Sequence, residues 1–314
     1  MSIRNELATG SAMLSFEFFP PTDEIGFWDL YRTIEALKPL DPTYVSVTYG
    51  AGGRTRKKTL ELVARIKSDM GMESMAHLTC VGSTRQELGA TLDELKQRGV
   101  GNVLALRGDP PQGEDTFVQP PGGFGHANEL ISFIHERHGD TFCVGAACYP
   151  EGHPECPSIE QDLDNLKRKV DSGVDFLITQ LFFDNADFFA FRDRASAGGI
   201  DVPIVAGIMP ILSVRQVKRF TEMCGAGIPR VLLEKIEAVE DDTEAVRHVG
   251  TYHATRQCQS LIEQDVAGIH FYTLNRSTAT RAIFQQIKAE LAVHRKPPPA
   301  RPATHPVAAS DPAG

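Results

Sequence analysis

The sequence Ser15-Phe16-Glu17-Phe18-Phe19-Pro20-Pro21 places a carboxylate inside an apolar run that stops at two prolines. The phenylalanines make this run typical of a buried strand, and proline does not continue a strand ladder. An ionised carboxylate in such surroundings is costly unless it is paired or neutralised. Glu17 is therefore a candidate proton donor whose pKa we expect to be raised by its phenylalanine neighbours. From this segment alone, a side chain that faces a wet loop or caps a helix would explain Glu17 equally well.

Seven further apolar runs follow, and amphipathic segments separate them. The predicted strands cover residues 14–19, 44–48, 74–79, 102–106, 142–146, 176–180, 203–208 and 268–272. The predicted helices cover residues 28–37, 57–70, 85–98, 126–138, 159–172, 186–197, 214–224 and 278–291. Strict alternation of strands and helices predicts an α/β fold, a closed parallel (β/α)8 TIM barrel. An open, doubly wound sheet is the structural alternative.

Two segments depart from this regular spacing. Residues 228–264 precede the eighth strand and are long enough for two more helices, so we expect extra helices there. Residues 297–314 contain six prolines among Ala, Ser, Thr and Arg, a composition that buries too little apolar surface to fold. We therefore expect a single barrel domain over residues 1–296 and a disordered tail over 297–314.

The composition is that of an ordinary soluble globular protein, with 314 residues, 41% hydrophobic content and a formal charge of −9. A negative chain without basic runs argues against nucleic-acid and anionic-membrane surfaces. The amino terminus lacks the apolar core of a signal peptide, which predicts a cytoplasmic protein with reduced cysteines. Cys148, His153 and Cys156 could begin a zinc site, but a structural site needs a fourth ligand. We also expect a homo-oligomer.

Unusual polar residues lie at or just beyond the carboxyl ends of the predicted strands. They are Glu17, Thr48, Tyr49, His77, Thr79, Arg107, Asp109, Tyr149, Glu151, His153, Gln180 and residues 272–276. Singly, His77 could be a core histidine, Arg107 part of a structural ion pair and Gln180 a strand-end cap. In an eight-unit barrel, however, the carboxyl ends of the strands converge on the face where active sites are built. We therefore expect these side chains to share one pocket.

Several segments could bind phosphate. The glycine-rich stretches 50–54 and 122–125 could offer backbone N–H groups to an anion, although neither matches Gly-x-Gly-x-x-Gly. Asp162, Asn165 and Lys169 recur along one face of a predicted helix, with Arg168 at its edge. A solvated amphipathic helix gives the same pattern. Beside the segment 149–154, this face could instead clamp a ribose and a pyrophosphate.

Eight ordered segments carry a family resemblance: residues 15–21, 45–50, 77–80, 105–109, 149–155, 165–169, 178–184 and 270–276. In these segments the chain resembles the methylenetetrahydrofolate reductases, which are barrel flavoproteins. The resemblance implies non-covalent FAD, with NADH or NADPH as co-substrate and a folate substrate that replaces it in a ping-pong reaction. The implied product is 5-methyltetrahydrofolate, used for methionine synthesis. The implied cofactor-binding residues are Thr48, Tyr49, Ala51, His77, Arg107, Gly108, Asp109, His126, Ala127, Tyr149, His153, Cys156, Asp162, Asn165, Arg168 and Lys169.

The resemblance also implies roles in catalysis and folate binding. Glu17 matches the proton donor, and a carboxyl group with a raised pKa suits protonation of the departing amine nitrogen. Asp109 would both tune the flavin and hydrogen-bond the pterin. The implied folate-contacting residues are Asp109, Gln180, Gln216, Phe220, Tyr272 and Arg276, with Phe220 stacked on the aminobenzoyl ring.

The chain departs from the family pattern at two cofactor positions. His126 stands where tyrosine is common, and Cys156 stands where a small residue would contact the adenine side. Without a second domain, we expect no inhibition by S-adenosylmethionine. Two alternative functions stay open: another barrel flavoprotein, such as a proline-dehydrogenase-like oxidase, and a flavin-carrying subunit that takes electrons from a partner complex.

Overall fold

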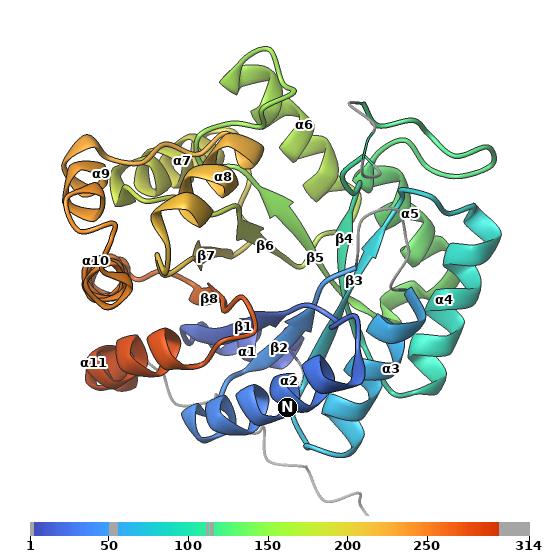
Figure 1. Cartoon of the computed structure of the whole chain (residues 1–314). Helices are drawn as coiled ribbons and strands as arrows, with labels where there is room; N and C mark the ends of the chain where they lie inside the picture. The colour runs from blue at the N-terminus through green and yellow to red at the C-terminus, as the bar shows by residue number, and fades with distance from the viewer. Residues whose placement is uncertain (1–2, 50–55, 111–112, 114–115, 295–314) are drawn as a thin grey trace, which may run out of the picture.

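Eight parallel strands close into a barrel in the structure, a computed structural model that describes residues 3–49, 56–110, 113 and 116–294 (Figure 1). The strands are β1 (Met13–Phe18), β2 (Tyr44–Val47), β3 (Ser74–Thr79), β4 (Asn102–Leu106), β5 (Cys143–Cys148), β6 (Phe176–Thr179), β7 (Ile204–Ile208) and β8 (Gly268–Tyr272). Each strand pairs with the next, and β8 returns to pair with β1. The predicted barrel is confirmed, and the open sheet is wrong.

Helices surround this barrel where the amphipathic periodicity predicts them. They are α2 (Glu24–Leu37), α3 (Arg56–Ser68), α4 (Arg85–Gln97), α5 (Ala127–His138), α6 (Ile159–Asp171), α7 (Asn185–Ala197), α8 (Val214–Cys224), α9 (Arg230–Glu237), α10 (Thr243–Glu263) and α11 (Thr278–His294), with short 3-10 turns η1 (Lys38–Leu40) and η3 (Gly139–Thr141). Helix α2 begins four residues before its predicted start, because Asp23 accepts a hydrogen bond from the backbone N–H of Gly26.

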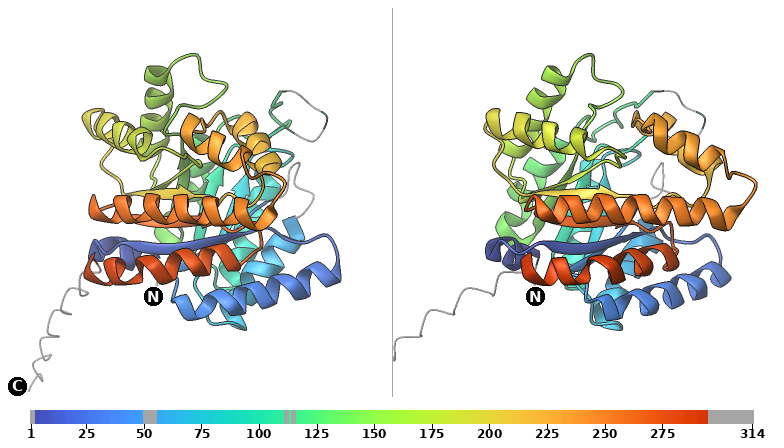
Figure 2. Two further views of the ribbon diagram at one scale, coloured as in Figure 1. Left: turned by 60° about the vertical axis from the view of Figure 1, so that its left-hand side comes forward. Right: turned by 90° about the vertical axis from the view of Figure 1, so that its left-hand side faces the viewer.

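The connection from β7 to β8 holds three helices, which confirms the predicted extra helices. Helix α10 packs against β7, α7 and α11, and Figure 2 shows α10 and α11 running side by side. The seventh place in the outer helical layer therefore belongs to α10 rather than to α8. Helix α8 buries Val214 and Val217 in a separate cluster with Leu181 and Met209, which follow β6 and β7. This packing places α8 beside the carboxyl ends of the strands.

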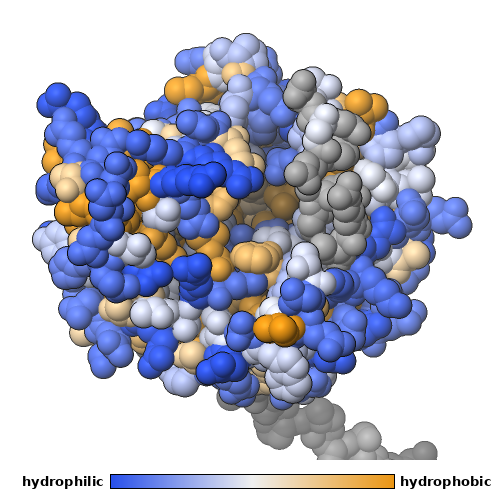
Figure 3. All heavy atoms as spheres, viewed as in Figure 1, coloured by the Kyte–Doolittle hydropathy of each residue, from blue (hydrophilic) through white to orange (hydrophobic). Residues whose placement is uncertain are grey.

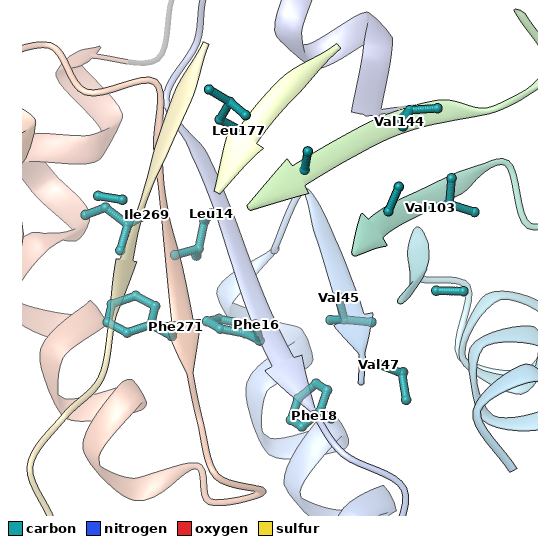
Figure 4. Close-up of a cluster of buried hydrophobic side chains, with 14 of the residues drawn as sticks. Leu14, Phe16, Phe18, Val45, Val47, Val103, Val144, Leu177, Ile269 and Phe271 are labelled. Carbon is teal, nitrogen blue, oxygen red and sulfur yellow. The ribbon is translucent and has the colours of Figure 1, made fainter. Parts of the chain in front are cut away.

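The two faces of β1 have opposite character. Leu14, Phe16 and Phe18 belong to the large core between the strands and the helices (Figure 4). Because side chains alternate along a strand, Ser15 and Glu17 face the barrel interior. The phenylalanines next to Glu17 in the sequence therefore lie on the other side of the sheet from its carboxylate.

A short helix that the sequence analysis did not predict, α1 (Ile3–Thr9), precedes β1 at the amino-terminal end of the barrel. Ile3 is fully buried in the inner apolar cluster with Met13. Arg4 donates to both carboxylate oxygens of Asp175, at 3.1 and 3.0 Å. Arg4 also donates to the backbone carbonyl of Phe142 at 2.8 Å. This end of the barrel is therefore filled with apolar side chains and covered by a helix that an ion pair holds in place.

Candidate functional site

One cavity of about 900 Å³ lies at the carboxyl ends of the strands, and residues on or just after all eight strands line it. Figure 3, drawn from the same side as Figure 1, shows the surface hollowed near the middle of this face. The predicted site residues that line the cavity are Glu17, Thr48, Tyr49, His77, Arg107, Gly108, Asp109, His126, Ala127, Tyr149, His153, Cys156, Asp162, Asn165, Arg168, Lys169, Gln180, Phe220 and Tyr272. The prediction that polar strand ends share one pocket is therefore confirmed for these residues and for Thr79, whereas Glu151, Thr273 and Asn275 are not among the described residues that line the cavity.

The remaining predicted site residues differ in their placement. Gln216 and Arg276 are not among the described residues that line the cavity, and Arg276 is exposed. Ala51 and the stretch 50–54 lie outside the described residues. In the second predicted anion loop, a Cβ added to Gly123 would meet the Ser83 carbonyl oxygen at 2.5 Å. Close packing against Ser83 therefore explains why residue 123 is a glycine. The residues that follow this loop line the cavity.

Glu17 meets two histidines inside the barrel. Its Oε2 lies 3.4 Å from Nε2 of His77 and 3.4 Å from Nε2 of His270. Nδ1 of His270 lies 2.8 Å from Oγ of Ser15, and its ring stacks on Tyr44 with centroids 6.1 Å apart. His270 is not among the predicted site residues, although strand alternation places it on the same face of β8 as Tyr272. The carboxylate thus belongs to a buried acid–base cluster of Glu17, His77, His270 and Ser15.

The protonation of this cluster differs from the prediction. Burial acts to raise the pKa of Glu17, but the hydrogen bond with His270 and the charges of His77 and His270 outweigh burial and lower it. The predicted rise in the Glu17 pKa is therefore wrong, because the contacts with the two histidines outweigh burial. Phe16 and Phe18 pack on the other face of β1. Burial lowers the pKa of His77 to about 4, which leaves that ring neutral near pH 7. The hydrogen bond with His270 is then the main contact that stabilises the Glu17 carboxylate.

At another part of the cavity, α6 and the loop before it bring charged groups together. The half-buried Lys169 donates from Nζ to the carbonyl of Ala147 at 2.8 Å, and desolvation lowers its pKa. Asp162 accepts the backbone N–H of His153 at 3.2 Å, and burial raises the pKa of this carboxyl group. Arg168 donates to Asn165. The predicted helical face therefore lines the cavity. The phosphate-clamp interpretation requires this position, whereas a fully solvated helix would not line a cavity.

Arg107 adds a further cation at the end of β4. Its Nη1 and Nη2 donate to the two carboxylate oxygens of Glu155 at 2.5 and 2.7 Å. The guanidinium also lies over the ring of Phe117, 5.2 Å from its centroid. Glu155 was not selected as a site residue, although it closes the matched segment 149–155. The sequence signal that could have identified Glu155 is its charged side chain at the end of a matched segment.

The tyrosines that line the cavity, Tyr272 and Tyr49, are fixed by hydrogen bonds of their hydroxyl groups and by packing of their rings. Tyr272 donates from its hydroxyl to the carbonyl of Thr179 at 2.7 Å. It lies against Gly207, where an added Cβ would sit 2.7 Å from the Tyr272 ring. The hydroxyl of Tyr49 accepts from Nε of Arg56 at 2.5 Å. These contacts fix the rings, so that the cavity has a preformed shape.

Gln180 and Asp109 complete the polar lining. The Oε1 of Gln180 accepts the backbone N–H of Leu181 at 2.8 Å, so its amide NH2 is the group that it offers to a ligand. Asp109 follows β4 on the cavity rim and is exposed. Together they supply one donor and one acceptor to the lining of the cavity.

The candidate zinc ligands Cys148 and Cys156 lie in different surroundings. Cys148 is buried, whereas Cys156 lies in the cavity lining with Sγ 3.7 Å from Nδ2 of Asn165. Across the part of the chain that the structure describes, no three His, Cys, Asp or Glu side chains are grouped to hold a metal ion. Within the same residues, no helix is both long and apolar enough to cross a membrane.

Comparisons with known proteins agree with this fold. Residues 2–288 match the family described as methylenetetrahydrofolate reductase. The chain is 37% identical over 312 residues to methylenetetrahydrofolate reductase (NADH) 1 of Arabidopsis thaliana, covering 96% of this chain and 53% of that protein. It is 38% identical over 274 residues to 5,10-methylenetetrahydrofolate reductase of Escherichia coli strain K12, covering 87% of this chain and 90% of that protein. The chain thus spans about half the length of the plant relative.

A solved structure shares the fold at lower identity. It is an uncharacterized protein from Clostridium thermocellum that binds two copies of 5-methyl-5,6,7,8-tetrahydrofolic acid. The TM-score is 0.63 at 16% identity, and the match covers 92% of this chain and 98% of that chain. This likeness supports the barrel fold.

Proposed function

The chain belongs to the methylenetetrahydrofolate reductase family, and we propose that it reduces 5,10-methylenetetrahydrofolate to 5-methyltetrahydrofolate, with FAD as its cofactor and NADH or NADPH as electron donor. One observation carries the proposal. A single cavity brings the carboxylate of Glu17 together with the cations Arg107, Arg168 and Lys169. Such a cavity suits a proton-dependent reaction beside a large, partly anionic cofactor.

The residues present fit FAD. A cavity of about 900 Å³ lies within the range of known cofactor sites. Arg168 and Lys169 offer cationic partners to a pyrophosphate, and Asp162 can accept hydrogen bonds from ribose hydroxyl groups. Tyr49 and Tyr149 offer ring surfaces to the flat parts of the cofactor. Bound there, the flavin would supply hydride transfer between the nicotinamide and the folate.

Glu17 would act as the general acid for the folate. The bridging methylene becomes an electrophilic iminium only after its bond to one nitrogen opens, and that nitrogen must gain a proton. In the structure, the pKa of Glu17 is lowered by its histidines. A substrate that covers this end of the cavity would exclude water and favour the neutral acid, and His270 would hold the carboxyl group in place. The protonated acid would then donate to the departing nitrogen.

Asp109 and Gln180 would position the pterin. The carboxylate of Asp109 can accept from ring N–H groups, and the Gln180 amide can donate to a ring oxygen. The negative charge of Asp109 near the flavin would also disfavour further negative charge there. Nicotinamide and folate would use the same space in turn, which predicts ping-pong kinetics.

The Glu17→Gln variant tests this proposal. We expect folate reduction to fall by about 10²- to 10⁴-fold, whereas reduction of the flavin by NADH or NADPH stays near the wild-type rate, since only the first process needs the proton. Anaerobic stopped-flow measurements of the two half-reactions separate these effects. Glu35→Gln, an exposed change on α2, is the matched control. An equal loss of rate in both half-reactions of Glu17→Gln would show that Glu17 is not the proton donor.

An anaerobic titration distinguishes the alternative functions. Bleaching of the flavin by NADH or NADPH alone would argue against a subunit that needs a partner complex for electrons. Oxidation of 5-methyltetrahydrofolate by the purified protein would argue against a proline-dehydrogenase-like flavoprotein. The same titration reports flavin content and the preferred donor. Cytoplasmic location and a homo-oligomer stay predictions.

A further inference from the structure

The ion pair between Arg107 and Glu155 lies within the cavity that the proposed cofactor would occupy. Both residues line the cavity, and the guanidinium meets the carboxylate through two hydrogen bonds of 2.5 and 2.7 Å. Glu155 is on the loop between β5 and α6. The Arg107 side chain is 22% exposed and the Glu155 side chain 55% exposed. The pair thus joins a fixed cation on the barrel to a carboxylate that borders solvent.

The other charged groups nearby are engaged differently. Lys169 donates to the backbone carbonyl of Ala147, and Arg168 donates to a neutral amide. Asp162 accepts a backbone N–H. Glu155, by contrast, accepts hydrogen bonds from both Nη groups of Arg107. Arginine uses the same pair of donors to bind phosphate in a bidentate manner.

We propose that the Glu155 carboxylate occupies the position on Arg107 that a phosphate of the cofactor would take, and that FAD displaces Glu155 when it binds. The inference rests on the proposed function, because it assumes that this cavity binds FAD. Glu155 would then weaken the affinity for flavins that carry phosphate and leave the affinity for phosphate-free flavins unchanged. It would be a specificity-determining residue of the cofactor site.

The local structure allows this exchange at low cost. The backbone N–H of Glu155 donates to Nδ1 of His153 at 3.1 Å, which holds the loop while the side chain turns outward. The contact with Phe117 keeps the guanidinium in the cavity after the carboxylate leaves. Partly exposed ion pairs contribute little net stability, so their loss is easily offset by a phosphate contact. We therefore expect removal of the Glu155 charge to tighten FAD binding by about three- to fivefold.

Flavin binding to the flavin-free protein tests the proposal. Quenching of flavin fluorescence gives the dissociation constants of FAD and of riboflavin for wild type and for Glu155→Gln. Glu160→Gln is the matched control, since it removes one carboxylate from the start of α6 outside the cavity lining. We expect Glu155→Gln to tighten FAD alone, and Glu160→Gln to change neither constant by more than about twofold. In an Arg107→Gln background, Glu155→Gln should have no effect on FAD.

The outcomes separate this inference from the proposed function. Weaker or unchanged FAD binding in Glu155→Gln would overturn displacement, and so would equal tightening of FAD and riboflavin. Persistence of the effect in the Arg107→Gln background would also overturn it. A wild-type protein that binds no FAD would instead contradict the proposed function itself. Circular dichroism of each variant shows that the fold is retained, so that a change in binding reports on the cavity.

Discussion

Glu17 and His270 lie 253 residues apart in the sequence and meet inside the barrel, with Oε2 of Glu17 3.4 Å from Nε2 of His270. The parallel pairing of β1 with β8 places Ser15 opposite His270, and the Ser15 hydroxyl holds the other ring nitrogen at 2.8 Å. When Ser15 donates to Nδ1, Nε2 is the ring nitrogen that carries a proton toward the carboxylate. His270 is therefore a positioning residue for Glu17.

Replacement of His270 should impair only the proton-dependent half of the proposed reaction. In His270→Gln we expect folate reduction to fall by about 10²-fold and flavin reduction to stay within a few-fold of wild type. We also expect the pH profile of folate reduction to shift, because the Glu17 pKa depends on this ring. Stopped-flow measurement of both half-reactions across pH checks both expectations.

A suitable control for this variant is His253→Gln. Nε2 of His253 donates a hydrogen bond to the Phe183 carbonyl at 2.9 Å, and His253 is not among the described residues that line the cavity. Similar losses in the two variants would mean that His270 acts through general stability instead of through Glu17.

The buried His77 should make the protein less stable in mild acid. Its folded pKa is about 4, below the ordinary value of 6.5, so between these values the unfolded chain binds a proton that the folded protein does not. The free energy of unfolding should therefore fall as the pH drops below 6.5, by up to about 1.4 kcal/mol per pH unit. Glu17, with its lowered pKa, adds a further loss as its carboxylate is protonated at lower pH.

His77→Gln removes this proton-binding group. Urea unfolding at pH 7 and pH 5 should show a smaller loss of stability in the variant than in wild type, by about 2 kcal/mol. His248→Gln, on an exposed face of α10, should behave as wild type. Identical pH dependence in wild type and His77→Gln would show that the ring is not buried in its neutral form.

Gly207 should tolerate no side chain. A Cβ there would lie 2.3 Å from the carbonyl oxygen of Thr179, to which Tyr272 donates, and 2.7 Å from the Tyr272 ring. Gly207→Ala should cost at least about 2 kcal/mol of stability and weaken folate binding by displacing Tyr272. Gly101→Ala is the matched control, because its nearest neighbour would be 3.7 Å away. Thermal unfolding and substrate titration compare the two variants, and equal stabilities would contradict the close contact.

The ion pair at the amino-terminal end of the barrel should stabilise the fold without affecting chemistry. Arg4→Met removes both hydrogen bonds to Asp175 and should lower the free energy of unfolding by about 1–2 kcal/mol. Arg32→Met removes an arginine whose side chain is 85% exposed and should have almost no effect. Denaturant unfolding measures the difference, and the rates of both half-reactions should be unchanged in each variant.

Strand and helix periodicity predicted the barrel and the gathering of its polar strand ends. Glu17, Arg107 and Gln180 could be assigned to one cavity because parallel strands in a closed barrel present their carboxyl ends to the same face. The short helix α1 escaped prediction, since seven residues carry little periodicity and its main contact, Arg4 with Asp175, joins distant parts of the chain.

The electrostatics of the site could not be predicted as reliably. Neighbours in sequence suggested an apolar setting for Glu17, but alternation along β1 sends Phe16 and Phe18 to the opposite face. The partners that set its pKa, His77 and His270, come from two other strands, and only the register of the closed barrel brings them together.

Closure of the ring by β8 has a consequence for how the protein is made. Glu17 is synthesised 253 residues before His270. Until β8 is complete, a nascent chain exposes the unpaired edge of β1 and carries the acid without the ring that orients it. The acid–base cluster can form only on a chain extended through β8, so prematurely terminated products should lack this chemistry even where most of the strands are present.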